Sequence, residues 1–376
     1  MFISKAESRK FVFSPYELCP CESGKKYKFC CHLKSKNSTI DNSNYTSQRI
    51  IHESQKGFNE TDFEICFAFN KEECDSKIIG AHSLQNNGVL DKISKDGHVY
   101  NLSFDIIDNH PTLKFNKIGK NRASTFLGFC KHHDKEYFSS IEDKPYYGTD
   151  LQNYLFAYRA YCFERHRKLR LKQKFTKLFQ KYPQATKDLR ILNMYKACVL
   201  DLKDKDIEYI RFKEIHEGNL YSNLESFVKE VPFKVGFTGT TAVAVNVDIN
   251  GQQTMDIYNY DEKVFIPSLY ISVIPKENSS LIIVTRHILD NCYKGLIEAL
   301  KVEEDEELIF KYISFCLSEF SENVYFSPKL INSLNDRSRD MIISAFHSSL
   351  EQNPYKRMQS LLKGFRLNLF DFKMTS

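Results

Sequence analysis

Four cysteines within thirteen residues constrain this chain more than any other feature. One residue separates Cys19 from Cys21, and the adjacent pair Cys30 and Cys31 follows after a spacer of eight residues. A Cys-x-Cys pair can place two thiolates on one side of a metal only where the backbone turns sharply, and Ser23-Gly24 permits that turn. The second pair then completes a closed tetrahedral site of the structural kind. We therefore predict a zinc ion held by these four thiolates.

A disulfide framework is the alternative interpretation of these cysteines. Adjacent cysteines bridge poorly, and nothing in the sequence indicates secretion. The segment CPCESGKKYKFCCH, residues 19–32, resembles the SEC-C motif, a zinc module of the SecA translocation ATPase that is also attached to many other bacterial proteins. In SecA the module docks a chaperone and ribosomes, so the resemblance implies a protein partner and names no reaction. The family usually has glycine at the position of Glu22, and the turn departs from the pattern there.

Length and composition limit the classes of protein that the chain can represent. With 376 residues and 42% hydrophobic content, it can build two or three compact cores, and no apolar run approaches the length of a membrane span. The N-terminus lacks the apolar core of a signal peptide, and eleven cysteines without one favour a reducing, bacterial cytoplasm. A net charge of +5 does not by itself require a nucleic-acid partner.

A second group of metal-ligating residue types lies between residues 60 and 149. Cys66 and Cys74 come first, and Cys130 and His133 follow with the C-x-x-H spacing that is common at the start of a helix. These four residues predict a second structural zinc site. Two buried thiols with surface histidines are the alternative, because cysteine often serves simply as a small core residue.

The order of these parts resembles an HNH, or ββα-metal, nuclease built on a treble-clef zinc scaffold. A cysteine pair is followed by a strand that ends in a histidine, by a hairpin, and by a helix that opens with further ligands. The resemblance implies that His82 is the general base that takes a proton from the attacking water. Asp134 stands where many members have a metal-binding histidine, and it implies Mg²⁺ or Mn²⁺ bound through oxygen. A buried, hydrogen-bonded histidine is the alternative for His82, and His98 is either a further site residue or a hairpin histidine.

Two departures from the HNH pattern stand beside the resemblance. The asparagine that normally orients the base is not evident shortly before Cys130, since Ser124 and Thr125 occupy that place and Asn121 comes too early. The separation of about fifty residues between the histidine and the second ligand pair also requires an insertion or a longer hairpin over residues 91–117.

A strongly basic segment follows the HNH-like region. Nine lysines and arginines within about thirty residues, with aromatic residues between them, predict a helix that could follow a nucleic-acid backbone. A solvated basic face opposite a packed aromatic face is the alternative. The basic residues are Arg159, Arg165, Arg167, Lys168, Arg170, Lys172, Lys174, Lys177 and Lys181.

Together the patterns predict a multi-domain α+β protein. We expect an N-terminal zinc module over residues 1–34, a linker over 35–59 with a short helix at 47–56, and an HNH-like domain over 60–149. A basic helical hairpin over 150–231 and a C-terminal domain over 232–376 complete the chain. In the last of these we expect an antiparallel sheet, with strands near 235–249, 253–260, 263–275 and 280–288, and helices near 288–300, 304–318 and 328–350.

The expected function is a metal-dependent endonuclease acting on DNA or RNA, in the setting of bacterial defence against phage. The rival interpretation is a non-catalytic adaptor that uses its zinc modules to bind protein or nucleic acid. The missing asparagine favours the adaptor, whereas His82 together with Asp134 favours the enzyme. The sequence contains no P-loop, no G-x-G-x-x-G, no G-x-S-x-G and no H-E-x-x-H, which argues against nucleotide hydrolysis.

Overall fold

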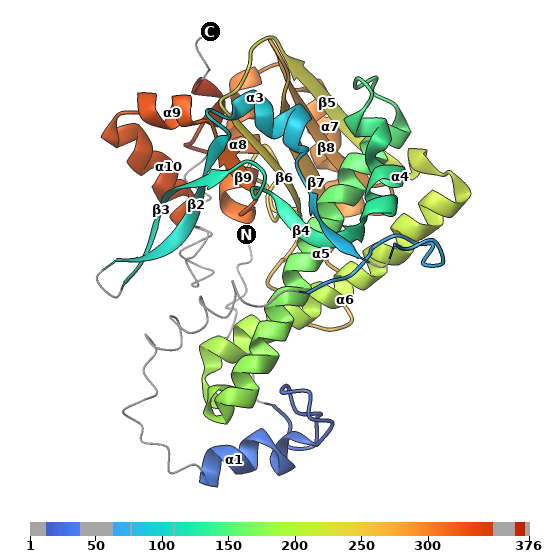
Figure 1. Ribbon diagram of the computed structural model, residues 1–376, viewed down its shortest axis with the longest axis vertical. Coiled ribbons are helices and arrows are strands. Elements are labelled where there is room, and N and C mark those ends of the chain that lie inside the picture. The colour runs from blue at the N-terminus through green and yellow to red at the C-terminus, as the bar shows by residue number, and fades with distance from the viewer. Residues whose placement is uncertain (1–12, 38–62, 76, 108–109, 349–364, 373–376) are drawn as a thin grey trace. The chain divides into compact units, whose positions relative to one another are not determined.

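The computed structural model describes residues 13–37, 63–75, 77–107, 110–348 and 365–372. The chain divides into two compact units, and each unit is assembled from two separate stretches of sequence (Figure 1). The smaller unit comprises Met1–Phe63 and Arg165–Asp206, and the larger one Glu64–Glu164 and Ile207–Ser376. The short helix expected at 47–56 lies outside the described residues.

The described part of the smaller unit is helical apart from the cysteine loop. Its core is formed by the four N-terminal cysteines with Phe175, Phe179, Leu192 and Leu202 of two long helices. The ring of Tyr27 joins this core, and its hydroxyl group lies 3.1 Å from Thr186 Oγ1. The helical elements are η1 (Tyr27–Phe29), α1 (Cys31–Asn37), part of α5 (Asp150–Lys181), η4 (Pro183–Lys187) and part of α6 (Leu189–Gly218).

The second long helix ends before the boundary expected for the helical hairpin. Helix α6 ends at Gly218, and the last part of the 150–231 segment contains a strand, β5 (Leu224–Val231). Asn219 adopts a φ of 52°, and the N–H of Leu220 donates to the carbonyl of Ile215 over 2.9 Å. A left-handed residue followed by such a bond is the Schellman arrangement that ends helices, and asparagine tolerates it.

The larger unit is organised around an antiparallel sheet of seven strands. Its order is β3-β2-β9-β6-β7-β8-β5, so strands distant in sequence lie side by side. The C-terminal antiparallel sheet is thus confirmed, but it also incorporates the hairpin of β2 and β3 from the middle of the chain. The strands are β2 (His98–Ile107), β3 (His110–Gly119), β5, β6 (Phe237–Val243), β7 (Leu269–Pro275), β8 (Ser280–His287) and β9 (Val324–Phe326).

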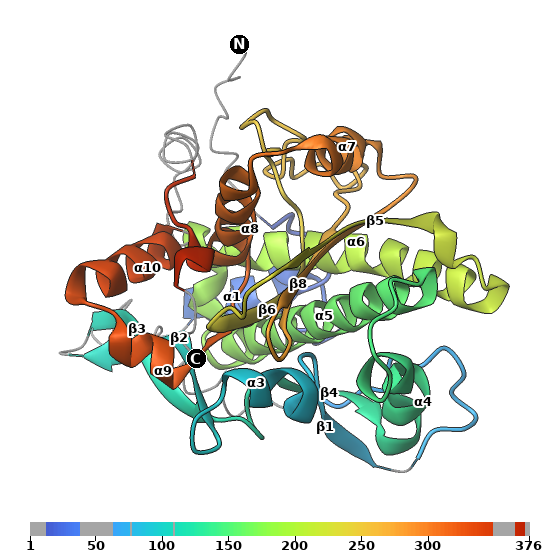
Figure 2. The ribbon, with the colours of Figure 1, turned by 90° about the horizontal axis from the view of Figure 1, so that it is seen from above.

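Helices cover both faces of this sheet, which explains why β7 and β8 are buried along their whole length. Figure 2 shows α7 (Lys294–Val302) and α8 (Glu306–Phe320) on one face and α5 on the other. Ile271 and Val273 of β7 pack toward the first face, while Ile274 packs toward the second. The continuous apolar runs read from the sequence follow from this double coverage.

Two C-terminal predictions differ from the structure in detail. Residues 253–260 form no strand, because the carboxylate of Asp256 and the amide oxygen of Asn259 accept main-chain N–H groups two residues further on and stabilise turns. The helix expected at 328–350 is interrupted, since Asn335 Oδ1 accepts the N–H of Ser338 and starts a new helix. The result is α9 (Pro328–Ser333) followed by α10 (Asp336–Ser348). None of the helices in the described part of the chain has the length and apolar character that crossing a membrane requires.

Candidate functional site

The four N-terminal cysteines converge on one point in the smaller unit. All four are buried, and their sulfur atoms lie within 4.8 Å of one another. Cys21 Sγ is 3.3 Å from Cys19 Sγ and 3.5 Å from Cys30 Sγ. A disulfide would place two sulfur atoms about 2 Å apart, whereas thiolates bound tetrahedrally at about 2.3 Å from zinc lie about 3.8 Å apart. The donor set therefore fits a tetrahedral metal ion and excludes the disulfide alternative for these pairs.

The loop between the cysteine pairs turns where the sequence departs from the SEC-C pattern. Glu22 has a φ of 56° and Gly24 a φ of 73°, so both adopt the left-handed conformation that glycine tolerates best. Glu22 N–H donates to the carbonyl of Cys19 over 3.0 Å, which closes the turn. The Glu22 carboxylate also lies 2.8 Å from Lys172 Nζ, a contact that glycine could not make.

The crowding of the thiols favours a bound cation. Burial raises the pKa of the Cys31 thiol, and the neighbouring Cys19 adds to that shift. Burial would also raise the pKa of Cys21, but hydrogen bonds with Ser23 and Cys19 outweigh it and lower the value to about 7. Because four thiolates repel one another, full ionisation needs a metal ion at the centre of the cluster. The four thiols could thus hold a metal ion such as zinc.

A ββα element in the larger unit builds the second cluster. Strand β1 (Ile78–His82) pairs antiparallel with β4 (Thr125–Cys130), and α4 (Lys131–Glu142) begins at the next residue. The segment that carries Cys66 runs beside β4, because the N–H groups of Ile65 and Phe67 donate to the carbonyls of Leu127 and Gly128 over 3.1 and 2.9 Å. Two distant stretches of sequence are thus held together by main-chain bonds.

The four predicted ligands of this second cluster meet at the start of α4. His133 Nδ1 lies 3.2 Å from Cys130 Sγ and 3.5 Å from the Sγ atoms of both Cys66 and Cys74. Tetrahedral zinc with one imidazole and three thiolates separates nitrogen from sulfur by about 3.6 Å. The distances therefore fit a zinc ion, and Cys74, which the sequence pairs only loosely with Cys66, belongs to the set.

The other ring nitrogen of His133 faces a carboxylate. The side chain is buried, its Nε2 has no hydrogen-bond partner, and Glu136 Oε2 lies 3.8 Å away. A metal-bound histidine commonly directs its second N–H to a carboxylate, which fixes the tautomer and increases the basicity of the ligand. His132 and Glu73 add further exposed donors beside Glu136. Glu136 is thus the residue that would orient His133 as a ligand.

His82 lies at the C-terminal end of β1, where its position in the sequence predicts a strand end. Its Nε2 atom is buried and has no hydrogen-bond partner. Burial lowers the pKa of His82, and hydrogen bonding to the backbone of Lys120 and Asn121 offsets that shift only in part. Burial therefore favours the neutral imidazole, and the unpartnered Nε2 is available for proton transfer.

Asp134 lies one turn into α4 with an unusual environment for a carboxylate. Its Oδ1 is buried and unpartnered, and burial raises its pKa to about 6, although the charge of Arg159 opposes that shift. Glu142 follows eight residues later on the same face of the helix. Phe138 lies midway between these two residues in the sequence, and Arg159 of α5 lies over its ring. Nη2 of Arg159 is 2.5 Å from Glu142 Oε1. Arg159 and Glu142 also affect the pKa of His82, so His82 and Asp134 share these two charged neighbours.

Sequence reasoning assigned no role at the site to Glu142 and counted Arg159 only as part of a basic helix. The helical spacing from Asp134 through Phe138 to Glu142 was the signal available for the first of these. Nothing local in the sequence indicates that Arg159 is buried, with only 3% of its surface exposed. Asn121 was expected to be too early to orient His82, yet its main chain lies beside that ring.

Two predicted features lie elsewhere. His98 begins β2 next to the Asp96-Gly97 turn, and its Nδ1 lies 2.6 Å from the carbonyl of Asp96. No metal-compatible cluster within the described residues includes it. In the smaller unit, Arg165 and Lys168 of the basic helix form ion pairs with Asp206 and Asp201. Part of the positive charge expected to contact nucleic acid is therefore used within the protein.

Comparisons with known proteins give no further assignment. No protein-family model matches the chain, and no curated protein and no solved structure matches it. The site must accordingly be interpreted from its own geometry.

Proposed function

We propose that this protein is a metal-dependent nuclease of the HNH type, with a separate SEC-C-like zinc module. In this proposal Cys66, Cys74, Cys130 and His133 hold a structural zinc ion at one end of the ββα element. His82 is the general base, and it deprotonates the water that attacks a phosphodiester. The observation that carries the proposal is that His82 Nε2 and Asp134 Oδ1 are both buried without a partner, and that Arg159 and Glu142 act on the charge of each.

Asp134, His82, Arg159 and Glu142 have complementary roles in this proposal. Asp134 Oδ1 would hold a magnesium or manganese ion, which stabilises the charge that develops on the phosphate when bound. The unpartnered Nε2 of His82 would take the proton. Arg159 supplies a fixed positive charge that acts on both residues, and Glu142 holds its guanidinium group in position through the 2.5 Å contact. These roles need no residue outside the larger unit.

The test compares two variants in a metal titration. Cleavage of single-stranded and plasmid DNA and of RNA is measured over a range of Mn²⁺ and Mg²⁺ concentrations. We expect Asp134→Asn to raise the metal concentration for half-maximal cleavage by at least about tenfold, since a ligand is weakened. His82→Ala should reduce the rate at every metal concentration by about 10² or more. An Asp134→Asn variant with an unchanged metal response would contradict the assignment of Asp134.

The adaptor interpretation is the alternative that this test also addresses. The ion pairs of the basic helix and the absence of a three-ligand carboxylate cluster around His82 in the described residues favour it. Wild-type protein that cleaves no substrate with any metal, while its zinc sites are loaded, would support a binding role for the zinc modules.

A further inference from the structure

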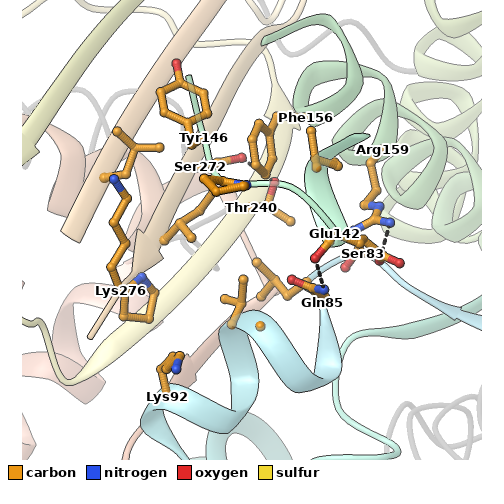
Figure 3. A pocket seen from close by; sticks show the side chains of 18 of the residues that line it. Ser83, Gln85, Lys92, Glu142, Tyr146, Phe156, Arg159, Thr240, Ser272 and Lys276 are labelled. Carbon is orange, nitrogen blue, oxygen red and sulfur yellow. Dashed lines mark hydrogen bonds and ion pairs between the residues drawn. The ribbon is translucent and has the colours of Figure 1, made fainter. Parts of the chain in front are cut away.

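The larger unit contains a cavity of about 560 Å³ beside the ββα element. Figure 3 shows that its walls come from several parts of the chain. Gln85 directly precedes the short helical segment after β1 and Lys92 lies on it. Tyr146 and Phe156 lie around the start of α5, and Ser272 lies on β7. This volume is within the range of small-molecule sites and would hold one nucleotide but no duplex.

The cavity carries a positive charge at a buried point. Arg159 is 97% buried and lines the cavity, and its Nε–H has no hydrogen-bond partner. A buried unpaired donor on a guanidinium group is costly unless a ligand or water accepts from it. Four cationic side chains line the cavity, namely Lys92, Lys144, Arg159 and Lys276. Lys92 pairs with Glu277, Arg159 with Glu142 and Lys276 with Glu230, so the excess positive charge of the cavity lies on Lys144.

The remaining walls suit a flat aromatic group. The rings of Tyr146 and Phe156 form one side, with their centroids 6.1 Å apart and their planes tilted by 56°. Lys276 Nζ lies 6.0 Å from the centre of the Tyr146 ring. Ile274 and Leu281 contribute apolar surface to the cavity. The hydroxyl groups of Thr240 and Ser272, which lie 2.8 Å apart, also line it and can form hydrogen bonds with a ligand. An aromatic wall next to a buried guanidinium group can hold a base and its phosphate together.

We propose that this cavity binds a nucleoside phosphate, with the phosphate on Arg159 and the base against Tyr146 and Phe156. Either a free nucleotide or one unpaired nucleotide of a single strand supplies this chemistry. The proposal does not depend on nuclease activity, because it concerns equilibrium binding. If the protein is also a nuclease, this cavity would make it prefer unpaired nucleic acid. Arg159 and Glu142 line the cavity and are also charged neighbours of His82.

The chain contains no tryptophan, so one introduced indole reports on the cavity alone. In Phe156→Trp protein, without added magnesium or manganese, each 5′-nucleoside monophosphate is titrated and the tryptophan emission is followed. We expect a saturable change with a nucleotide and a much weaker one with the matching nucleoside or with inorganic phosphate. Phe315→Trp, on half-buried Phe315 of α8, is the matched control and should not respond.

Further variants in the Phe156→Trp background test the role of the guanidinium group. Arg159→Gln should weaken nucleotide binding at least about tenfold, because a charge-assisted bond is lost. Arg211→Gln removes a comparable contact, 2.6 Å from Asp290, and should leave binding unchanged. Should Arg159→Gln fail to fold, exposed Lys144→Gln still tests the charge, with a several-fold weakening expected at low salt.

Competition by short single-stranded oligonucleotides distinguishes the two sources of the ligand. Displacement of the nucleotide by a single strand but not by a duplex would identify the unpaired nucleotide of a strand, and no displacement would identify a free nucleotide. The proposal is overturned if no nucleotide alters the Phe156→Trp emission, or if Arg159→Gln and Lys144→Gln both bind as tightly as the parent. Nucleotide binding by a protein that cleaves nothing would leave this proposal intact while refuting the nuclease.

Discussion

Removal of one cysteine from the second cluster should halve the zinc content of the protein. Eight donors form two separate four-ligand clusters, one in each unit, so the wild-type chain should carry two zinc ions. Cys130→Ala removes the sulfur closest to His133 Nδ1, at 3.2 Å, and leaves three donors. Cys316→Ala is the matched control, because Cys316 is equally buried but belongs to neither cluster.

The size of the effect follows from the geometry of the cluster. Loss of a group that merely orients a ligand costs 10- to 100-fold in metal affinity, or about 1.4 to 2.7 kcal/mol. Loss of a direct ligand should exceed that, and the larger unit should lose at least about 2 kcal/mol of stability where zinc had been saturating. Glu136→Gln changes only the carboxylate 3.8 Å from His133 Nε2, so it should reduce the zinc affinity of this cluster by only about 10- to 100-fold.

Elemental analysis of purified protein gives the zinc content, and thermal unfolding gives the stability. We expect two zinc ions per chain in wild-type and Cys316→Ala protein and one in Cys130→Ala. A wild-type content of one or none would refute the two-site assignment. So would a Cys130→Ala protein that retains both ions, since the cluster would then not depend on its closest sulfur.

Three stability predictions concern residues outside the clusters. Burial lowers the pKa of His287 to about 4, and its Nδ1 accepts the N–H of Leu289, so the stability it contributes above about pH 6.5 is lost as pH falls to 4. The slope of unfolding free energy against pH over this range should be shallower in His287→Asn, by up to about 3 kcal/mol in total; equal slopes in denaturant titrations would contradict this. Asn219→Ala should cost about 1 kcal/mol in chemical denaturation, whereas Asn219→Gly should cost nothing, because φ is 52° there. Tyr27→Phe should cost about 1 kcal/mol in the smaller unit through loss of the contact with Thr186, and an unchanged midpoint would show that the hydroxyl group is dispensable.

The sequence allowed the donor sets to be predicted because metal ligands follow local spacing rules. Cys19, Cys21, Cys30 and Cys31 lie within thirteen residues of sequence, and Cys130 and His133 lie at one helix start, so neither placement depends on distant contacts. The position of His82 at a strand end was also readable, from the apolar residues that precede it. The mixed α+β class followed from alternating strand patterns and long helical spacing.

The remaining features depend on contacts between distant segments. The pairing of β2 with β9 joins residues more than two hundred positions apart, and no local pattern encodes it. The burial of Arg159 results from packing of α5 against α4, so its sequence suggested only a basic surface. The cavity could not be predicted because its walls come from separate strands and helices that meet only in the folded chain.

Cleavage by His82→Ala protein tests whether His82 is the general base. Wild-type protein, His82→Ala and the control His347→Ala, which changes an exposed histidine of α10, are compared on single-stranded DNA, plasmid DNA and RNA with Mg²⁺ or Mn²⁺. We expect metal-dependent cleavage by wild-type and His347→Ala protein, and loss of cleavage in His82→Ala protein that still folds and carries two zinc ions. Equal cleavage by His82→Ala protein, or none by any of the three proteins, would contradict this assignment.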